Sequence, residues 1–241
     1  MTDSSKSFNA RLSHIWEPPN FFSLVAAIKR PPASIKKGRI LFSDGDVLER
    51  LHYIQEGFVK LYRVSEEGKE TISYLYGPGY VVGLRALLSK DKIAKHNAEA
   101  LTDLKVVSIT HGEYFDIVSK YPAFIIDLTH YFMDRLELTE RTIEGFIATD
   151  VITRVAHFLL DFVMRFCKTD KSQTITLSLS FTHQRIAEFI GSSRETVSVS
   201  IQRLEKDGIL TIAKGKVTIN KLGVLRKYAQ INKKKNQELS L

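Results

Sequence analysis

Short apolar segments separated by glycine-containing turns occupy the chain from Ala33 to Ile109. Among them, Phe58–Val64 alternates between apolar and polar residues, as a half-buried strand does. Turn sequences such as Asp44-Gly45-Asp46 and Gly77-Pro78-Gly79 interrupt the segments, and Lys105–Ile109 closes the series. The pattern predicts several short strands folded into a β-sandwich or a barrel-like roll.

A longer helical pattern follows over Ala123–Ile147. The residues that define it are Phe124, Ile125, Leu128, Phe132, Leu136, Leu138, Thr139, Ile143 and Phe146. Many of them fall in a stripe of the a/d kind, which suits a seam between two helices. The stripe predicts a dimerisation helix. Its alternative is burial of the same stripe against the strand-rich part of its own chain.

Two shorter helical patterns meet at Gly191, within Phe181–Leu210. Thr182 is placed to cap the first helix and Ser193 to cap the second. Two helices joined by a short turn that contains glycine form a helix-turn-helix, whose second helix enters the major groove of DNA. The alternative is an ordinary surface hairpin of two helices. The glycine, the two caps and the base-reading pair all occur at the positions that a helix-turn-helix requires, which favours the helix-turn-helix.

The first turn of the second helix carries Arg194 and Glu195. Arginine can donate to guanine O6 and N7, and glutamate can accept from cytosine N4. After this helix, the apolar residues of 209–212 and 216–219 flank Ala213-Lys214-Gly215, which predicts a hairpin wing. Before it, Asp150 is placed to cap a helix over Val151–Phe166.

Composition narrows the class of protein. The 241 residues are enough for two domains, and the net charge of +8 favours a polyanionic partner. Cys167 is the only cysteine, so one chain cannot build a disulfide framework or a cysteine-ligated iron–sulfur cluster. No apolar run approaches the length of a membrane span, and the first ten residues are unlike a signal peptide. We expect a cytoplasmic protein without membrane contact.

The order of strand-rich part, long helix and winged helix-turn-helix resembles the Crp/Fnr family of bacterial transcription regulators. The residues that carry the resemblance are Gly38, Gly45, Glu56-Gly57, Lys60, Gly68, Gly79, Val82-Gly83, Asp150-Val151, Arg154, Ile186-Ala187, Gly191 and Ser193-Arg194-Glu195-Thr196-Val197. The resemblance implies an α+β fold with a cyclic-nucleotide-binding-like β-roll, a dimerisation helix and a winged helix-turn-helix. It divides the chain into an N-terminal extension (1–32), the roll (33–121), the helix (122–148), the DNA-binding domain (149–222) and a tail (223–241). It further implies a homodimer on near-palindromic double-stranded DNA, and activation through contact with RNA polymerase.

The same resemblance assigns DNA contacts to the helix-turn-helix. Arg194 and Glu195 would read the inner bases of each half-site. Contacts to phosphates or to the groove edge would come from Thr182, His183, Gln184, Ser193, Thr196 and Ser198. Family members commonly have a second arginine where Val199 stands here. Because a valine can touch a thymine methyl but cannot donate to guanine, we expect a different base at that position.

An effector site is less clearly defined. The family's cyclic-AMP binders have a glutamate where this chain has Leu84, and an arginine pair near the position of Ala94-Lys95. Neither the glutamate nor the arginine is present here, so we do not expect cyclic AMP. The chain is closer to the nitrogen-control branch, which senses 2-oxoglutarate. That branch implies an anion site formed by Val82, Gly83, Leu84, Arg85, Lys95, Arg135 and Glu140. An unidentified effector, and an effector-independent regulator in which Arg135 and Glu140 form a salt bridge, remain alternatives.

Other classes of protein find little support. The sequence contains no HExxH, GxSxG, Walker A or CxxC pattern, so we predict no catalytic residues and no metal site. His96 and His111 are candidate haem ligands, although a lone histidine is more often structural. The alternative outside transcription is a ligand-binding signalling module whose C-terminal domain docks a protein.

Overall fold

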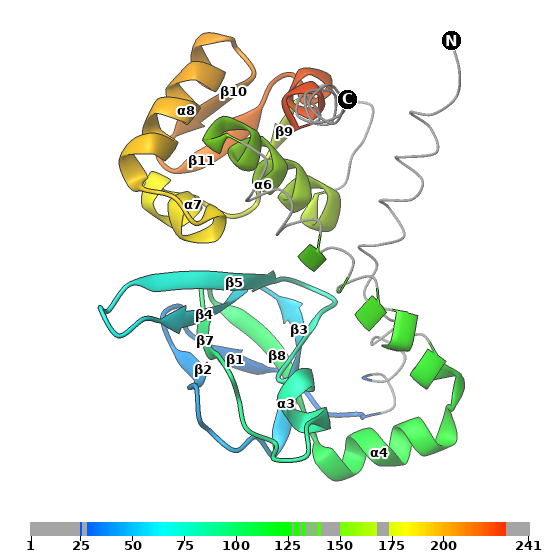
Figure 1. Cartoon of the computed structure of the whole chain (residues 1–241). Helices are drawn as coiled ribbons and strands as arrows, with labels where there is room; N and C mark the ends of the chain where they lie inside the picture. Colours follow the sequence, from blue (N-terminus) through cyan, green and yellow to red (C-terminus); the bar gives the residue numbers. More distant parts are fainter. Residues whose placement is uncertain are drawn as a thin grey trace, which may run out of the picture. The chain divides into compact units, whose positions relative to one another are not determined.

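A computed structural model of the chain describes residues 25, 28–126, 128–130, 132–133, 136, 139–140, 150–167 and 174–229. It contains two compact units, one within Pro18–Met133 and the other within Asp134–Leu241 (Figure 1). The predicted α+β class is confirmed, with a β-rich N-terminal part, helical residues after it and a C-terminal helix-turn-helix.

Two antiparallel four-stranded sheets form the N-terminal unit (Figure 1). The first has the order β1-β8-β3-β6 and consists of β1 (Ala33–Ile35), β3 (Arg50–Glu56), β6 (Val81–Val82) and β8 (Leu104–Thr110). The second has the order β2-β7-β4-β5 and consists of β2 (Ile40–Phe42), β4 (Val59–Val64), β5 (Glu70–Tyr76) and β7 (Asn97–Ala100). The predicted roll is therefore present, but β6 and β7 were not predicted.

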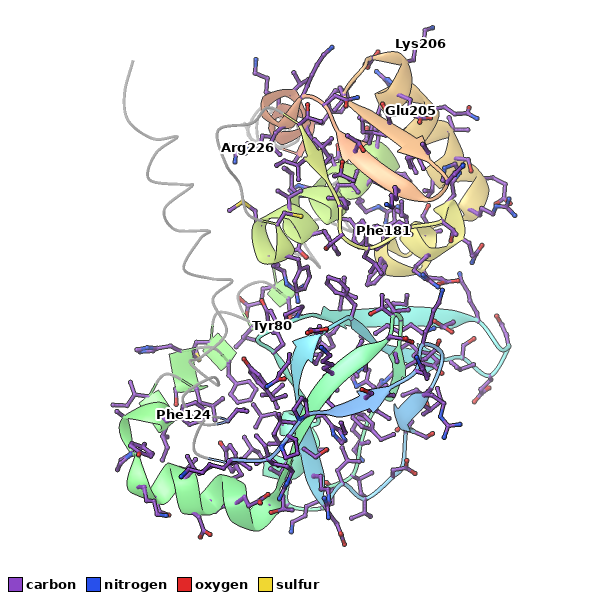
Figure 2. The ribbon with its side chains drawn as sticks, turned by 180° about the vertical axis from the view of Figure 1, so that it is seen from behind. Tyr80, Phe124, Phe181, Glu205, Lys206 and Arg226 are labelled. Carbon is purple, nitrogen blue, oxygen red and sulfur yellow. The ribbon has the colours of Figure 1, made fainter. Side chains whose placement is uncertain are left out.

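Helices cover one face of the first sheet. They are α3 (Leu84–Leu88), α4 (His111–Lys120) and the helical residues described between 123 and 133. Phe124 (Figure 2) and Leu128, each 7% exposed, belong to the same core cluster as Tyr53 and Val107 of this sheet. Part of the stripe predicted for a dimer seam is thus buried against its own roll, as the alternative had it.

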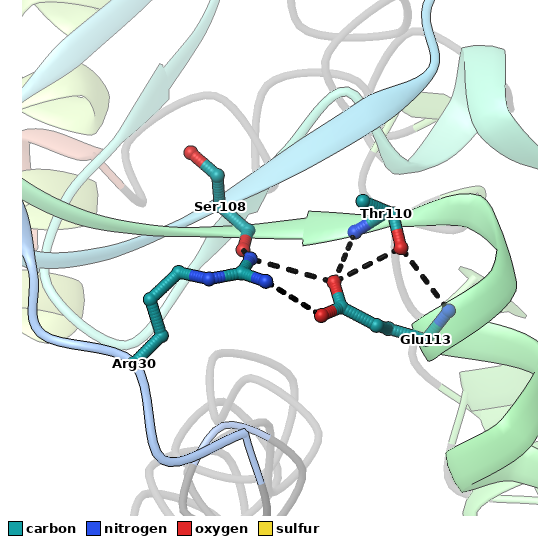
Figure 3. A network of polar contacts seen from close by, with 4 residues as sticks. All are labelled: Arg30, Ser108, Thr110 and Glu113. Carbon is teal, nitrogen blue, oxygen red and sulfur yellow. Dashed lines mark hydrogen bonds and ion pairs between the residues drawn. The ribbon is translucent and has the colours of Figure 1, made fainter.

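Arg30, in the segment before β1, forms an ion pair and hydrogen bonds with this unit (Figure 3). Arg30 Nη2 lies 2.6 Å from Glu113 Oε1, and Arg30 Nη1 donates to the backbone carbonyl of Ser108. Glu113 also forms a capping box with Thr110 at the start of α4, accepting from the Thr110 N–H at 2.8 Å. Because the Thr110 N–H, and then Arg30, hydrogen-bond its charged form, the pKa of the Glu113 carboxyl is lowered.

Three helices and a small sheet build the C-terminal unit. They are α6 (Val151–Phe166), α7 (His183–Ile190), α8 (Arg194–Lys206), and a sheet of order β10-β11-β9 with β9 (Ile175–Thr176), β10 (Leu210–Ala213) and β11 (Lys216–Ile219). Asp150 caps α6, as predicted, by accepting from the Thr153 N–H. Residues 222–229 are helical and Leu225 is fully buried, so ordered structure continues into the tail that the sequence analysis placed at 223–241.

Candidate DNA-binding surface

Side-chain caps fix both helices of the helix-turn-helix. Thr182 Oγ1 accepts from the Arg185 N–H at 3.1 Å, and Ser193 Oγ accepts from the Thr196 N–H at 3.2 Å. Between them, Gly191 ends α7 with φ 60° and ψ 50°, a left-handed conformation that glycine adopts at little cost. The predicted caps of both helices and the predicted end of the first at Gly191 are confirmed, and the short turn sets the direction in which α8 leaves α7.

An aromatic cluster around Phe181 (Figure 2) joins α6 to α7. The ring of Phe181, which is fully buried, lies 5.1 Å from the rings of Phe158 and Phe162 in α6, edge to face with both. Phe158 also packs on Phe189 of α7. On α8, the buried residues are Val197, Ser200, Ile201 and Leu204. Burial of one face of α8 leaves the opposite face in solvent.

Arg194, Glu195 and Thr196 are exposed in the first turn of α8. The pKa of the Glu195 carboxyl is lowered, because its own backbone N–H and the Ser193 hydroxyl donate to it. The carboxylate is therefore charged at neutral pH and available to accept a hydrogen bond. The first turn presents a forked donor and an acceptor side by side, as base recognition requires.

A hydrogen-bonded chain joins α7 to α8. The Ser198 hydroxyl donates to the backbone carbonyl of Arg194 at 2.9 Å, and Ser198 Oγ lies 2.7 Å from Nδ1 of His183. Because a carbonyl oxygen only accepts, the single hydroxyl hydrogen of Ser198 is used there, and Nδ1 of His183 donates to Ser198. Both predicted contact residues thus take part in positioning the helices.

The other predicted DNA contacts lie at the N-terminal ends of the two helices. Thr182, Gln184 and Ser193 are exposed. Gln184 Nε2 donates to Glu188 Oε1 at 2.9 Å, and the hydroxyl oxygens of Ser193 and Thr196 are 2.9 Å apart. The helix-turn-helix therefore brings together all eight residues predicted from the sequence, in one domain and around two helix N-termini.

The wing supplies residues that the sequence reasoning missed. Lys214 and Gly215 form its turn, with φ 50° and 77°, and Ala213 still pairs with Lys216 in the ladder. The turn has two residues instead of the predicted three. The wing is tied to α8 because Glu205 Oε1 accepts from the Ile212 N–H at 2.8 Å. Lys214 and Lys216 are exposed at the turn. The sequence could have indicated them as candidate phosphate contacts, because both lie at a predicted hairpin turn.

The residues predicted to bind an effector differ in exposure and in the contacts that they make. The side chains of Val82 and Leu84 are buried and apolar, so these two residues could offer a ligand only their backbone groups, whereas Arg85 is exposed. Gly83 is the N-cap residue of α3. Lys95 Nζ lies 3.5 Å from Asp91 Oδ2, an ion pair that competes with binding an anion. Glu140 is exposed and belongs to the C-terminal unit, and Arg135 lies outside the described residues.

Two side chains in the region where the resemblance would place a cyclic-AMP site are apolar and buried. Leu84 is 5% exposed and Ala94 is 2% exposed, so neither offers a polar group to a ligand. His96 packs against Tyr74, and His111 against Phe115. Within the described residues, no group of three or more His, Cys, Asp or Glu side chains is placed to hold a metal ion. None of the helices in that part of the chain is long and apolar enough to cross a membrane.

Two family models match the chain. Residues 32–121 match the cyclic nucleotide-binding domain, and residues 153–228 match the Crp-like helix-turn-helix domain. The second match contains α7, α8 and the wing, so the exposed first turn of α8 belongs to a DNA-binding domain of known type.

Relatives agree over most of the length. The chain is 30% identical over 205 residues to a global nitrogen regulator of a Nostoc species, which covers 84% of this chain and 92% of that protein. A transcriptional regulator of the CRP/FNR family from Thermus thermophilus is 27% identical, with a TM-score of 0.66 over 83% of this chain and 98% of that one. FixK2 from Bradyrhizobium japonicum, 20% identical, shares the fold with a TM-score of 0.71 over 82% of this chain and 96% of that one. The chain therefore belongs to the Crp/Fnr family, whose members are transcription regulators and not enzymes.

Proposed function

We propose that this regulator binds a near-palindromic operator as a homodimer and reads each half-site with the first turn of α8. The observation that carries the proposal is the exposed pair Arg194 and Glu195 on a helix whose start is fixed by the Ser193 cap. Arginine and glutamate side chains at the N-terminal end of a recognition helix are suited to guanine and cytosine edges. The exposed lysines of the wing add non-specific attraction to phosphates.

Dimerisation is supported by the apolar residues that the long helix leaves in solvent. Ile125, Ile126 and Met133 are 50–60% exposed, although Phe124 and Leu128 of the same helix are buried against the roll. Leu136, further along, is 52% exposed. Exposed apolar side chains on one helical stretch favour an interaction site in soluble proteins, and a second copy offers the same side chains. Two copies would place two recognition helices in successive major grooves.

Selection from random duplexes, followed by gel-shift titration, tests this proposal. The full-length protein should enrich a sequence with two related half-sites about one helical turn apart. A duplex with one half-site scrambled should bind far more weakly than the intact palindrome. A signalling module that does not recognise DNA predicts only weak, salt-sensitive retention with no enriched sequence, and that result would refute the proposal.

For the effector, we propose a small anion other than cyclic AMP, with 2-oxoglutarate as the first compound to test. The apolar residues Leu84 and Ala94 argue against a cyclic phosphate, and relatives named as global nitrogen regulators support a nitrogen-linked signal. Arg85 and the backbone at Gly83 are the groups on the roll that remain suited to a carboxylate. Isothermal calorimetry with 2-oxoglutarate should show binding heat; no heat would favour an effector-independent regulator.

The remaining features of the proposal come from the family. A dimer on its operator would act in the cytoplasm as an activator that contacts RNA polymerase. Transcription from a template carrying the selected operator, with purified polymerase, should rise when the protein is added; a fall would make it a repressor.

A further inference from the structure

Val199 on the recognition helix is the most exposed large hydrophobic side chain in the described part of the chain, at 66%. A β-branched residue at an exposed helical position has a lower helix propensity than alanine or a straight-chain residue. Its apolar surface also gains nothing while it stays in water. The stability of the folded domain therefore gives no reason for a valine at this place, and a binding partner would.

The position of Val199 on α8 makes that partner DNA. Val199 follows Glu195 by four residues and precedes Gln202 by three, so the three side chains share one face of the helix. The buried residues Val197, Ile201 and Leu204 occupy the opposite face. A helix that lies in the major groove with Glu195 at the bases must therefore bring Val199 to the bases one turn further along.

The neighbouring polar side chain is already engaged. Ser198 donates its only hydroxyl hydrogen to the Arg194 carbonyl and accepts from His183, so it has no donor left for a base. The exposed side chain that would face the bases one helical turn after Glu195 is therefore the apolar Val199. The edges of the base pairs in the major groove present hydrogen-bonding groups with one apolar exception, the C5-methyl group of thymine.

We propose that Val199 is a specificity-determining residue that selects a thymine in each half-site by packing its γ-methyl groups against the C5-methyl group. The inference rests on the proposed function, because it requires α8 to enter the major groove. It adds a third base preference to the two expected from Arg194 and Glu195, and it involves no hydrogen bond.

Deoxyuridine provides the test, because it lacks only the C5-methyl group of thymidine. On the selected operator, each thymine of a half-site is replaced in turn by uracil, and the affinity of the full-length protein is measured. One position per half-site should lose about three- to fivefold in affinity, the factor that corresponds to one buried methyl-sized group. The Val199→Ala variant should lose this preference for thymine over uracil and keep its discrimination at the guanine. In the selection itself, Val199→Arg should change the enriched base at that position from thymine to guanine.

Val224→Ala is the matched control, since it removes the same two methyl groups from another exposed valine of the C-terminal unit that does not lie on α8. Its uracil profile should equal that of the wild type. Uracil replacement without effect at every thymine would overturn the inference and leave the regulator proposal intact. So would a Val199→Ala variant that loses equal affinity for the thymine and uracil duplexes, because the coupling between the two groups would then be zero. If selection enriches no sequence, both proposals fail together.

Discussion

Replacing Arg194 by alanine should weaken operator binding without weakening the fold. The guanidinium group is exposed at the first position of α8, and the hydrogen bond from Ser198 reaches the Arg194 backbone carbonyl, which alanine retains. Surface substitutions of this kind change the free energy of unfolding by about 0.5 kcal/mol or less. A bidentate contact from arginine to guanine contributes about 1–3 kcal/mol of discrimination. We therefore expect a loss of about ten- to hundredfold per half-site, with an almost unchanged thermal midpoint.

Fluorescence anisotropy with two probes measures the effect, one being the selected operator and the other a scrambled duplex of the same composition. Arg194→Ala should lower the affinity for the operator and change that for the scrambled duplex far less. Lys206→Ala, which removes the same charge from the exposed last turn of α8, should lower both by a similar factor. If Arg194→Ala also lowered both equally, Arg194 would be a phosphate contact and the proposed orientation of α8 would be wrong.

Four further predictions address the interface, the effector, the core and the pH dependence. Leu136→Glu should abolish the dimer and operator binding together, because the seam would bury an unpaired carboxylate; a dimer of unchanged affinity in sedimentation would reject the seam. Millimolar 2-oxoglutarate should tighten operator binding about 5- to 150-fold, and Arg135→Ala should abolish that response but not basal binding; no response in the wild type would eliminate this ligand. Phe181→Ala should cost about 3–5 kcal/mol, because its buried ring contacts two others in α6, so urea should unfold the C-terminal unit earlier; an unchanged midpoint would contradict this. Glu113→Gln should destabilise the chain by about 1 kcal/mol at pH 7 and by less at pH 3. The pKa of Glu113 is lowered in the fold, so the stability that its carboxylate adds is present above the unfolded-state value and is lost as the pH falls through the folded value; an equal loss at both pH values would refute this sign.

The helix-turn-helix was predicted almost residue by residue because its signals are local. A side-chain cap such as Thr182 or Ser193 satisfies N–H groups two or three residues away, and Gly191 provides a left-handed turn at its own position. These features need no knowledge of the rest of the fold. The wing turn was placed one residue too long, since a lysine at a left-handed position is not the expected signal for a two-residue turn.

The roll was predicted in outline, and its missing elements depend on distant partners. Strand β7 exists because it pairs with β2 on one side and β4 on the other, and β6 consists of only Val81 and Val82 paired with β3. Strand β6 is too short to show a period, and the four residues of β7, although they alternate, include no β-branched or aromatic residue. The burial of Phe124 and Leu128 against the roll was missed for the same reason. A helical stripe shows which residues are apolar, but the surface that covers each of them depends on the tertiary structure.

The contacts within the C-terminal unit also restrict how an effector can act on DNA binding. The wing is joined to α8 through Glu205, α8 to α7 through Ser198 and His183, and α7 to α6 through the ring of Phe158. Changing the angle between α7 and α8 would break the hydrogen bond between His183 and Ser198, and moving the wing would leave the Ile212 N–H without its acceptor, each at a cost of about 1–3 kcal/mol. Such costs are as large as a typical coupling free energy between an effector and a second ligand. The cheaper route keeps the helix-turn-helix and its wing rigid. In the proposed dimer, it would change how the two C-terminal units are placed on the operator. An effector acting by this route would alter the preferred spacing between half-sites before it altered the bases preferred within one. Selection with and without 2-oxoglutarate can distinguish the two effects.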